Sequence, residues 1–170
     1  MSANGRLKFA VAGSALALAM STFGVSPAQA DDQQPIGLEV EMPANLKITE
    51  ATEVPEGAET ADAAAATATH PCIGYTATYA SDGCFQPYGD VFYATDLLAD
   101  GKSAAIGIFT DYGRVEEVCI VSLGAGKRGK CDLDYWEKGS VKLEVLLYDS
   151  DTKKFYQPVA WSGWLPVDSQ

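Results

Sequence analysis

Residues 140–148, SVKLEVLLY, contain the clearest strand pattern in this chain. Apolar side chains recur at every second position, while Lys142 and Glu144 fall between them. The alternating apolar positions are Val141, Leu143, Val145 and Leu147. A two-residue period is typical of a strand with one face against a core. The stretch therefore predicts a half-buried β-strand.

Further short stretches on the N- and C-terminal sides of this one have the aromatic and β-branched composition of strands. They are residues 73–80, 90–95, 104–110, 114–121 and 155–161. Turn sequences separate them, namely SDG at 81–83, ADG at 99–101, DYG at 111–113, EKG at 137–139 and DSDT at 149–152. No long helical pattern lies between them. Strands at this spacing predict an all-β fold, a small antiparallel β-sandwich or barrel.

The cysteines predict that two disulfides stabilise this fold. Cys72 and Cys84 enclose 11 residues, and so do Cys119 and Cys131. Four cysteines allow three connectivities, and the matched, turn-rich segments favour the two local pairs. Each bridge would stabilise the domain by roughly 3 kcal/mol on the chain-entropy model. Zinc needs closer ligand spacings, such as C-x-x-C, so we expect no metal site here.

The first 30 residues predict export. Arg6 and Lys8 precede an apolar run over residues 9–20, and the small residues Ala28 and Ala30 then flank Gln29. This is the layout of a Sec-type signal peptide cleaved after Ala30. The apolar run is too short to span a bilayer. We therefore expect a secreted, extracellular protein.

Residues 31–71 differ from both neighbouring parts of the chain. They are acidic, and residues 50–69, EATEVPEGAETADAAAATAT, have no large apolar residue after Val54. Such a segment cannot bury enough surface to offset chain entropy. Residues 36–42 alternate, which leaves open an edge strand or an extended arm. The expected organisation is a signal peptide (1–30), an acidic, largely disordered arm that folding does not need (31–71), and a β domain (72–170).

The charge of the chain limits its partners. The formal net charge is −11 at pH 7, and a surface of this sign repels nucleic acid and anionic lipid. We therefore expect neither nucleic acid nor membrane as a partner. A protein or a cell-wall or polysaccharide ligand remains.

Two sets of residues are candidates for binding. Residues 124–130, GAGKRGK, place Lys127, Arg128 and Lys130 in a positive patch, which a Cys119–Cys131 bridge would present to an acidic partner. The alternative is a flexible, solvated loop. The second set consists of Trp136, Trp161 and Trp164. Aromatic side chains on a β face can stack on sugars or anchor a protein, although in a domain of this size they can equally belong to the core.

Catalytic chemistry has little support in this sequence. His70, the one histidine, lies beside Pro71 at the edge of the arm, where nothing would orient it. The cysteines are expected to be oxidised, which removes a thiolate nucleophile. Asp149 and Asp151 are expected to form a turn, with calcium binding as the alternative. We therefore predict no catalytic residue, no metal and no cofactor.

Several motifs resemble those of small secreted, disulfide-stapled β proteins of actinobacteria that have no assigned activity. They are DGKSA at 100–104, VCIVSLGAGKRGKC at 118–131, KGSVKLEV at 138–145 and the Trp-rich end. Residues 72–84, CIGYTATYASDGC, are also similar to the first disulfide loop of the proteinaceous α-amylase inhibitors, but lack the Trp-Arg-Tyr triplet of those inhibitors. The resemblance implies a fold and not a function.

These observations together predict a secreted, non-enzymatic binding or interaction module. The alternatives are a secreted hydrolase inhibitor or a small extracellular hydrolase.

Overall fold

The computed structural model describes residues 37–55 and 71–168, in which eleven β-strands form two sheets. The described residues all belong to one compact unit. The predicted signal peptide with its cleavage site at Ala30, residues 31–36 and 56–70 of the predicted arm, and with them His70, lie outside the described residues.

The first sheet has six strands, and all of its pairs are antiparallel except β2 with β8. In spatial order the strands are β1 (Glu39–Val40), β11 (Lys154–Pro166), β10 (Ser140–Asp149), β7 (Ser103–Thr110), β8 (Glu117–Val121) and β2 (Lys47–Glu50). The predicted strand at 140–148 is β10. It is an inner strand of the sheet, with β11, the longest strand, on one side and β7 on the other.

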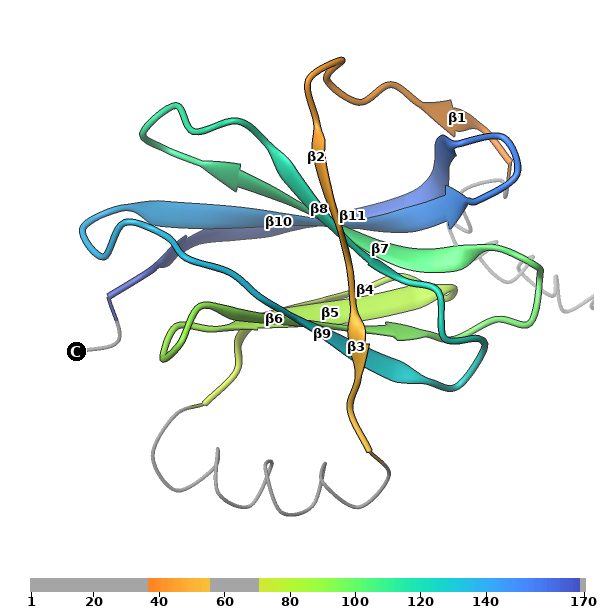
Figure 1. Ribbon diagram of the computed structural model, residues 1–170, viewed down its shortest axis with the longest axis horizontal. Coiled ribbons are helices and arrows are strands. Elements are labelled where there is room, and N and C mark those ends of the chain that lie inside the picture. The colour runs from red at the N-terminus through yellow and green to blue at the C-terminus, as the bar shows by residue number, and fades with distance from the viewer. Residues whose placement is uncertain (1–36, 56–70, 169–170) are drawn as a thin grey trace, which may run out of the picture. The chain divides into compact units, whose positions relative to one another are not determined.

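The second sheet has five strands and is antiparallel throughout. Its order is β3 (Thr52–Glu53), β9 (Arg128–Asp132), β6 (Val91–Asp96), β5 (Ser81–Gln86) and β4 (Ile73–Ala77). Figure 1 shows the two sheets as an upper and a lower layer, which is the arrangement of a β-sandwich. The all-β prediction is confirmed.

The core between the layers follows from the alternation in β10. Val141, Leu143 and Val145 are fully buried and pack in one cluster with Phe85 and Phe92 of the opposite sheet. The two rings stack with their centroids 4.6 Å apart. Burial of each such side chain contributes roughly 1.5–3 kcal/mol, and this cluster therefore holds the two sheets together.

The two disulfides have the predicted pairing. Cys72 is bonded to Cys84, and Cys119 to Cys131. The second bridge joins β8 of one sheet to β9 of the other, and both of its residues are buried. The first bridge joins the residue before β4 to β5 of the same sheet. Only the Cys119–Cys131 bridge therefore links the two layers.

For residues 37–55, the structure corrects the expectation of a largely disordered arm over 31–71, and of the two alternatives for 36–42 it shows the edge strand, β1. The segment supplies both edge strands of the six-stranded sheet, β1 beside β11 and β2 beside β8, and one edge strand of the five-stranded sheet, β3 beside β9. In Figure 1 it runs from the upper layer to the lower (orange). Pairing with a strand that is already ordered gives its backbone hydrogen bonds that an isolated acidic segment lacks. Val54, at the end of this segment, is buried.

Two expected turns or loops are strands in the structure. The SDG sequence at 81–83 begins β5, and residues 128–130 of the expected GAGKRGK loop belong to β9. Gly83 explains the first difference, because a Cβ atom there would lie 2.3 Å from Ile106 Cδ1 of the opposite sheet. This glycine allows close packing between the sheets and does not mark a turn.

Candidate functional site

The outer face of the six-stranded sheet is divided into a covered and an open half. Leu146 and Tyr148, which point away from the core, form a second apolar cluster with side chains of the N-terminal segment. The covering side chains of that segment are Val40, Met42 and Leu46. Lys142 and Glu144 share this outward orientation, and both precede the covered positions in β10. Among the described residues, the N-terminal segment covers Leu146 and Tyr148 but not Lys142 and Glu144. We refer to the half of the face that holds Lys142 and Glu144 as the open half.

A β-bulge places two tryptophans on the open half. Trp161 pairs with Glu144 and Trp164 pairs with Lys142, with a register shift between these pairs. Residues three apart in a regular strand point to opposite faces, whereas an extra residue in a bulge restores the same face. The Leu143 backbone N–H donates to Ser162 Oγ at 2.8 Å inside the bulge. Trp161 and Trp164 are 47% and 55% exposed.

Aromatic and cationic groups meet above β10. Phe109 of β7 and Trp161 of β11 approach from opposite sides of β10, with ring centroids 5.2 Å apart. Lys142 Nζ lies 4.4 Å from the Trp161 ring centroid, a cation–π contact. We refer to Phe109, Lys142, Glu144, Trp161 and Trp164 as the aromatic surface.

Glu144 is a buried carboxyl group at the edge of this surface. It is 3% exposed, and burial raises its pKa from 4.5 to about 7, although the charge of Lys142 opposes this shift. Gly107 lies opposite Glu144 in β7. A Cβ atom at Gly107 would lie 3.3 Å from Glu144 Oε2 and 3.2 Å from Phe109 Cε2. The missing side chain thus leaves room for the carboxyl group beneath the ring.

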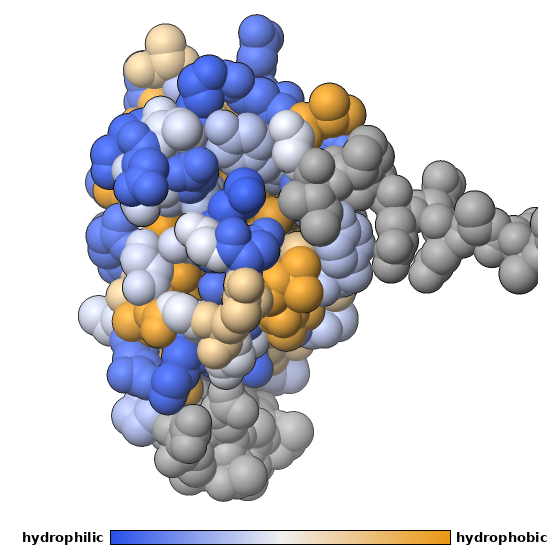
Figure 2. All heavy atoms as spheres, turned by 90° about the vertical axis from the view of Figure 1, so that its right-hand side faces the viewer, coloured by the Kyte–Doolittle hydropathy of each residue, from blue (hydrophilic) through white to orange (hydrophobic). Residues whose placement is uncertain are grey.

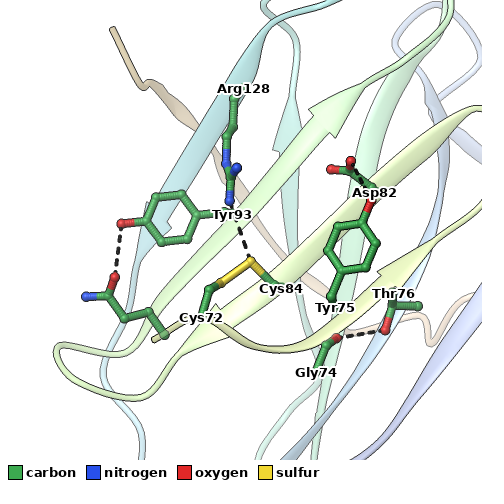
Figure 3. Close-up of a disulfide and its surroundings, with 9 residues drawn as sticks. Cys72, Gly74, Tyr75, Thr76, Asp82, Cys84, Tyr93 and Arg128 are labelled. Atoms are coloured by element: carbon green, nitrogen blue, oxygen red, sulfur yellow. Dashed lines mark hydrogen bonds between the residues drawn. A yellow bond between two sulfur atoms is a disulfide. The ribbon is translucent and has the colours of Figure 1, made fainter. Parts of the chain in front are cut away.

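The predicted basic residues occupy different environments. Lys127 forms an ion pair with Glu53, Nζ to Oε1 3.1 Å. Arg128 lies on β9 with its guanidinium 4.9 Å from the Tyr93 ring centroid and its Nη2 3.5 Å from Cys84 Sγ. Figure 3 shows Arg128 between Tyr93 and the disulfide. Lys130 also lies on β9, where it is paired in register with Tyr93 of β6. The three cations therefore do not share one exposed loop, because β9 includes two of them.

Trp136 lies in the connection between β9 and β10. Its ring packs edge-on against Tyr112 with centroids 5.5 Å apart, and it is 56% exposed. Its backbone N–H donates to the Tyr112 hydroxyl at 3.1 Å. Of the three tryptophans predicted to bind, Trp161 and Trp164 therefore lie near each other on the outer face of β11. Trp136 lies elsewhere and packs against Tyr112.

A second buried carboxyl group, Glu117, belongs to a polar network that no sequence pattern indicates. It is 2% exposed and accepts hydrogen bonds from Tyr135 Oη at 2.6 Å, from Arg114 Nη2 at 3.2 Å and from Lys47 Nζ. Burial alone would raise the pKa of Glu117, but the hydrogen bonds from Lys47 and Tyr135 and the charge of Arg114 lower it below its ordinary value. Lys47 lies on β2, Arg114 on the connection from β7 to β8, and Tyr135 on the connection from β9 to β10. The hydrogen bonds of Glu117 therefore join these three parts of the fold to β8.

The predicted turn at 149–152 is present after Asp149, which ends β10, and Asp151 lies in the turn itself. Asp149 Oδ1 accepts hydrogen bonds from the backbone N–H groups of Asp151 at 2.8 Å and Thr152 at 3.2 Å. Among the described residues no group of three or more His, Cys, Asp or Glu side chains is arranged to hold a metal ion. In the same part of the chain no helix is long and apolar enough to cross a membrane.

Elsewhere the exposed hydrophobic residues are scattered. On the face seen in Figure 2, hydrophobic residues (orange) form small separate patches among hydrophilic ones (blue). Leu38, Ile48, Tyr75, Leu97 and Val115 are exposed in different elements or loops. Single exposed apolar residues are normal for a folded protein. The aromatic surface differs because it combines two exposed tryptophans with a buried carboxyl group.

Comparisons of the chain with known protein families, with curated proteins and with solved structures found no match. The resemblance to secreted actinobacterial β proteins and to α-amylase inhibitors therefore stays a prediction. The candidate site depends on the geometry of this chain alone.

From the sequence, Trp161 and Trp164 are candidates for binding, whereas Glu144, Lys142 and Phe109 are not. The alternation in β10 placed Lys142 and Glu144 on its polar face, which is ordinarily solvated. The available signal was Gly107 in a strand, because a strand glycine often marks a close approach by another group. The group that approaches Gly107 is known only from the pairing of β7 with β10.

Proposed function

We propose that this chain is exported and acts outside the cell as a non-catalytic module that binds a neutral polysaccharide through the aromatic surface. One observation carries the proposal: two half-exposed tryptophans share a sheet face with a carboxyl group that accepts no hydrogen bond from any described residue. Aromatic rings and an unpaired hydrogen-bond acceptor are the groups that a sugar needs from a protein.

The chemistry of a pyranose fits these groups. One or both faces of the ring carry C–H groups, which pack against the face of an indole, while the rim carries hydroxyl groups that donate and accept hydrogen bonds. Trp161 and Trp164 supply the stacking area. Glu144 supplies an acceptor, and Lys142 supplies a donor.

The size of the surface supports a sugar over a protein partner. Two half-exposed tryptophans offer on the order of 200 Å² of aromatic area. A stable protein–protein interface buries about 800 Å² on each partner. A few sugar units would cover the tryptophans, whereas a protein would need a much larger complementary area.

The carboxyl groups support binding over hydrolysis. Most glycoside hydrolases use two carboxyl groups that flank the scissile bond. Among the described residues, the aromatic surface contains Glu144 alone. A single carboxyl group can accept a hydrogen bond, but it cannot act both as the general acid and as the nucleophile or base in the same step.

An extracellular site of action agrees with the disulfides. Cys72–Cys84 and Cys119–Cys131 are both closed, and such bonds form and persist in oxidising compartments. This supports the export that residues 1–30 predict.

The test is retention on insoluble polysaccharides. The full chain, expressed with its own first 30 residues in a bacterial host, is collected from the medium, and its N-terminus is determined by mass spectrometry. We expect a start at Asp31 and sedimentation with cellulose, chitin or xylan. Trp164→Ala should weaken binding about tenfold or more, because exposed aromatic anchors dominate binding energies.

Trp136→Ala is the matched control, since Trp136 is 56% exposed and Trp164 55%. Trp136→Ala should bind as the wild type does. Wild-type protein that sediments with none of the three polymers contradicts the proposal, as does equal binding by the two variants.

A further inference from the structure

Glu144 is the one polar group of the aromatic surface that the fold buries without giving it a hydrogen bond. We infer that Glu144 is a ligand-binding residue of this surface, that its carboxylate accepts hydrogen bonds from hydroxyl groups of the bound sugar, and that binding therefore depends on pH. The inference rests on the proposed function and identifies the chemistry of its ligand: a sugar that presents hydroxyl donors beside the stacked ring.

The position of Glu144 suits this role. Phe109 and Trp161 approach each other across β10 with ring centroids 5.2 Å apart, and Glu144 lies opposite Trp161 in register. Its Oε2 atom lies over Gly107, where a Cβ atom would come within 3.3 Å. The carboxyl group therefore lies over Gly107 and beside Phe109, next to Trp161 in register. In the proposed complex, the hydroxyl rim of a sugar that stacks on the aromatic surface reaches it.

The carboxyl oxygens can still be reached. Among the described residues, Asp90 Oδ1 is the one fully buried side-chain oxygen or nitrogen without a hydrogen-bond partner. The two oxygens of Glu144 also lack a hydrogen-bond partner among the described residues. Neither of them is completely buried, however, because it would otherwise share this property with Asp90 Oδ1. The residue as a whole is only 3% exposed.

The groups that face Glu144 leave its charge largely unbalanced. Gly107 and Phe109 on β7 and Trp161 on β11 do not titrate at ordinary pH. Lys142, on β10 itself, is the one charged group whose field acts on the carboxyl among the described residues. Its Nζ lies over the Trp161 ring and forms no ion pair with Glu144. A bound sugar would therefore supply the first hydrogen bonds to this carboxylate.

Binding should consequently be linked to ionisation. Burial raises the pKa of the free Glu144 to about 7, whereas hydrogen bonds from sugar hydroxyls favour the ionised form. The ligand then lowers the pKa in the complex, and binding releases a proton at acidic pH. The sign follows from this: affinity rises as pH increases toward 7 and levels off above it.

The experiment measures the Kd by titration calorimetry at pH 5.5 and 8.0. The probe is cellohexaose, chitohexaose or xylohexaose, matching the polymer that retains the protein. We expect wild-type binding to be about tenfold tighter at pH 8.0, the effect of one charge-assisted hydrogen bond. Glu144→Gln should bind about tenfold more weakly at pH 8.0 and with the same Kd at both pH values.

Glu116→Gln is the control for charge, since it removes a carboxyl that lies outside the aromatic surface. It should keep the wild-type Kd and pH profile. If Glu144→Gln also keeps both, the inference fails. Loss of binding by Trp164→Ala in the same series would then leave the proposed function standing, whereas wild-type binding by Trp164→Ala would reject the proposed function itself.

Thermal unfolding at both pH values shows whether each variant is folded. Gly107→Ala provides a second route, because its Cβ presses on Glu144 Oε2 and Phe109 Cε2 without changing any charge. It should weaken binding of the hexasaccharide at pH 8.0. Unchanged binding by a folded Gly107→Ala variant would contradict the role of Glu144.

Discussion

Glu144 and Glu117 are buried carboxyl groups of the same sheet, yet their pKa values shift in opposite directions. Glu117 lies among Lys47, Arg114 and Tyr135, whose hydrogen bonds and charges outweigh the effect of burial. Glu144 has a single charged neighbour and no hydrogen bond, so burial dominates. The ionised form is therefore stabilised by the fold at one site and destabilised at the other. The first carboxyl serves the fold, and the second is the one that we propose for ligand binding.

The free energy of unfolding should report this difference for Glu144. Its pKa is about 7 in the folded chain, against an ordinary value of 4.5. Between these values the folded state binds more protons than the unfolded state, so stability present below about pH 4.5 is lost as pH rises through 7. Glu144→Gln lacks this loss. At pH 8 it should be more stable than the wild type by roughly 1–3 kcal/mol, after allowance for solvent screening.

Urea unfolding followed by tryptophan fluorescence at pH 4.5 and 8 measures both stabilities. Burial also raises the pKa values of Asp90 and Asp96, so the relevant quantity is the difference between the variant and the wild type at each pH. The two proteins should converge at pH 4.5. A difference that does not change with pH would contradict the pKa assigned to Glu144.

At the scale of single elements, β11 shows how a bulge changes the use of a sequence. Residues 161–164, WSGW, place tryptophans three positions apart, a spacing that points them to opposite faces of a regular strand. The register shift opposite Leu143 brings both to the outer face. Ser162 supplies its hydroxyl to the Leu143 N–H at this point, which replaces a hydrogen bond of the regular ladder.

The two disulfides allow a matched comparison between elements. Both close loops with a sequence separation of 12, so the chain-entropy contribution of each is equal, roughly 3 kcal/mol. Cys119–Cys131 additionally joins the two sheets, and both of its residues are buried. Replacing Cys119 and Cys131 together with alanine should therefore destabilise the protein by about 1–2 kcal/mol more than replacing Cys72 and Cys84, since a cavity is added.

Chemical unfolding of the two double variants gives the comparison directly. Wild-type protein under reducing conditions should lose at least as much stability as either variant. An equal loss in the two variants would mean that the inter-sheet position of Cys119–Cys131 adds nothing beyond loop closure.

At the scale of the whole described unit, the N-terminal segment connects the two layers. Residues 37–55 pair with β11 and β8 in one sheet and with β9 in the other. They also cover Leu146 and Tyr148 with Val40, Met42 and Leu46. The segment thus contributes edge strands and apolar cover, and it sets the boundary of the open half that contains the aromatic surface.

Truncation tests this contribution. A chain that begins at residue 37 should unfold cooperatively, whereas a chain that begins at residue 71 should lose several kcal/mol, because Val118, Ile120 and Leu146 lose apolar cover and β8 loses a partner strand. Differential scanning calorimetry of the two chains measures the effect. Equal transition temperatures would restore the interpretation of residues 31–71 as an arm that folding does not need.

The sequence by itself determined the all-β class, the strand at 140–148 and the pairing of the four cysteines. These depend on alternation, turn residues and matched loop lengths, which act over short distances along the chain. Only the tertiary structure decided that residues 47–50 and 52–53 are strands, that WSGW contains a bulge, and that Glu144 lies over Gly107 beside Phe109 and Trp161. The reason is physical: edge pairing, register and burial depend on which distant strand lies alongside, and no local pattern specifies that neighbour.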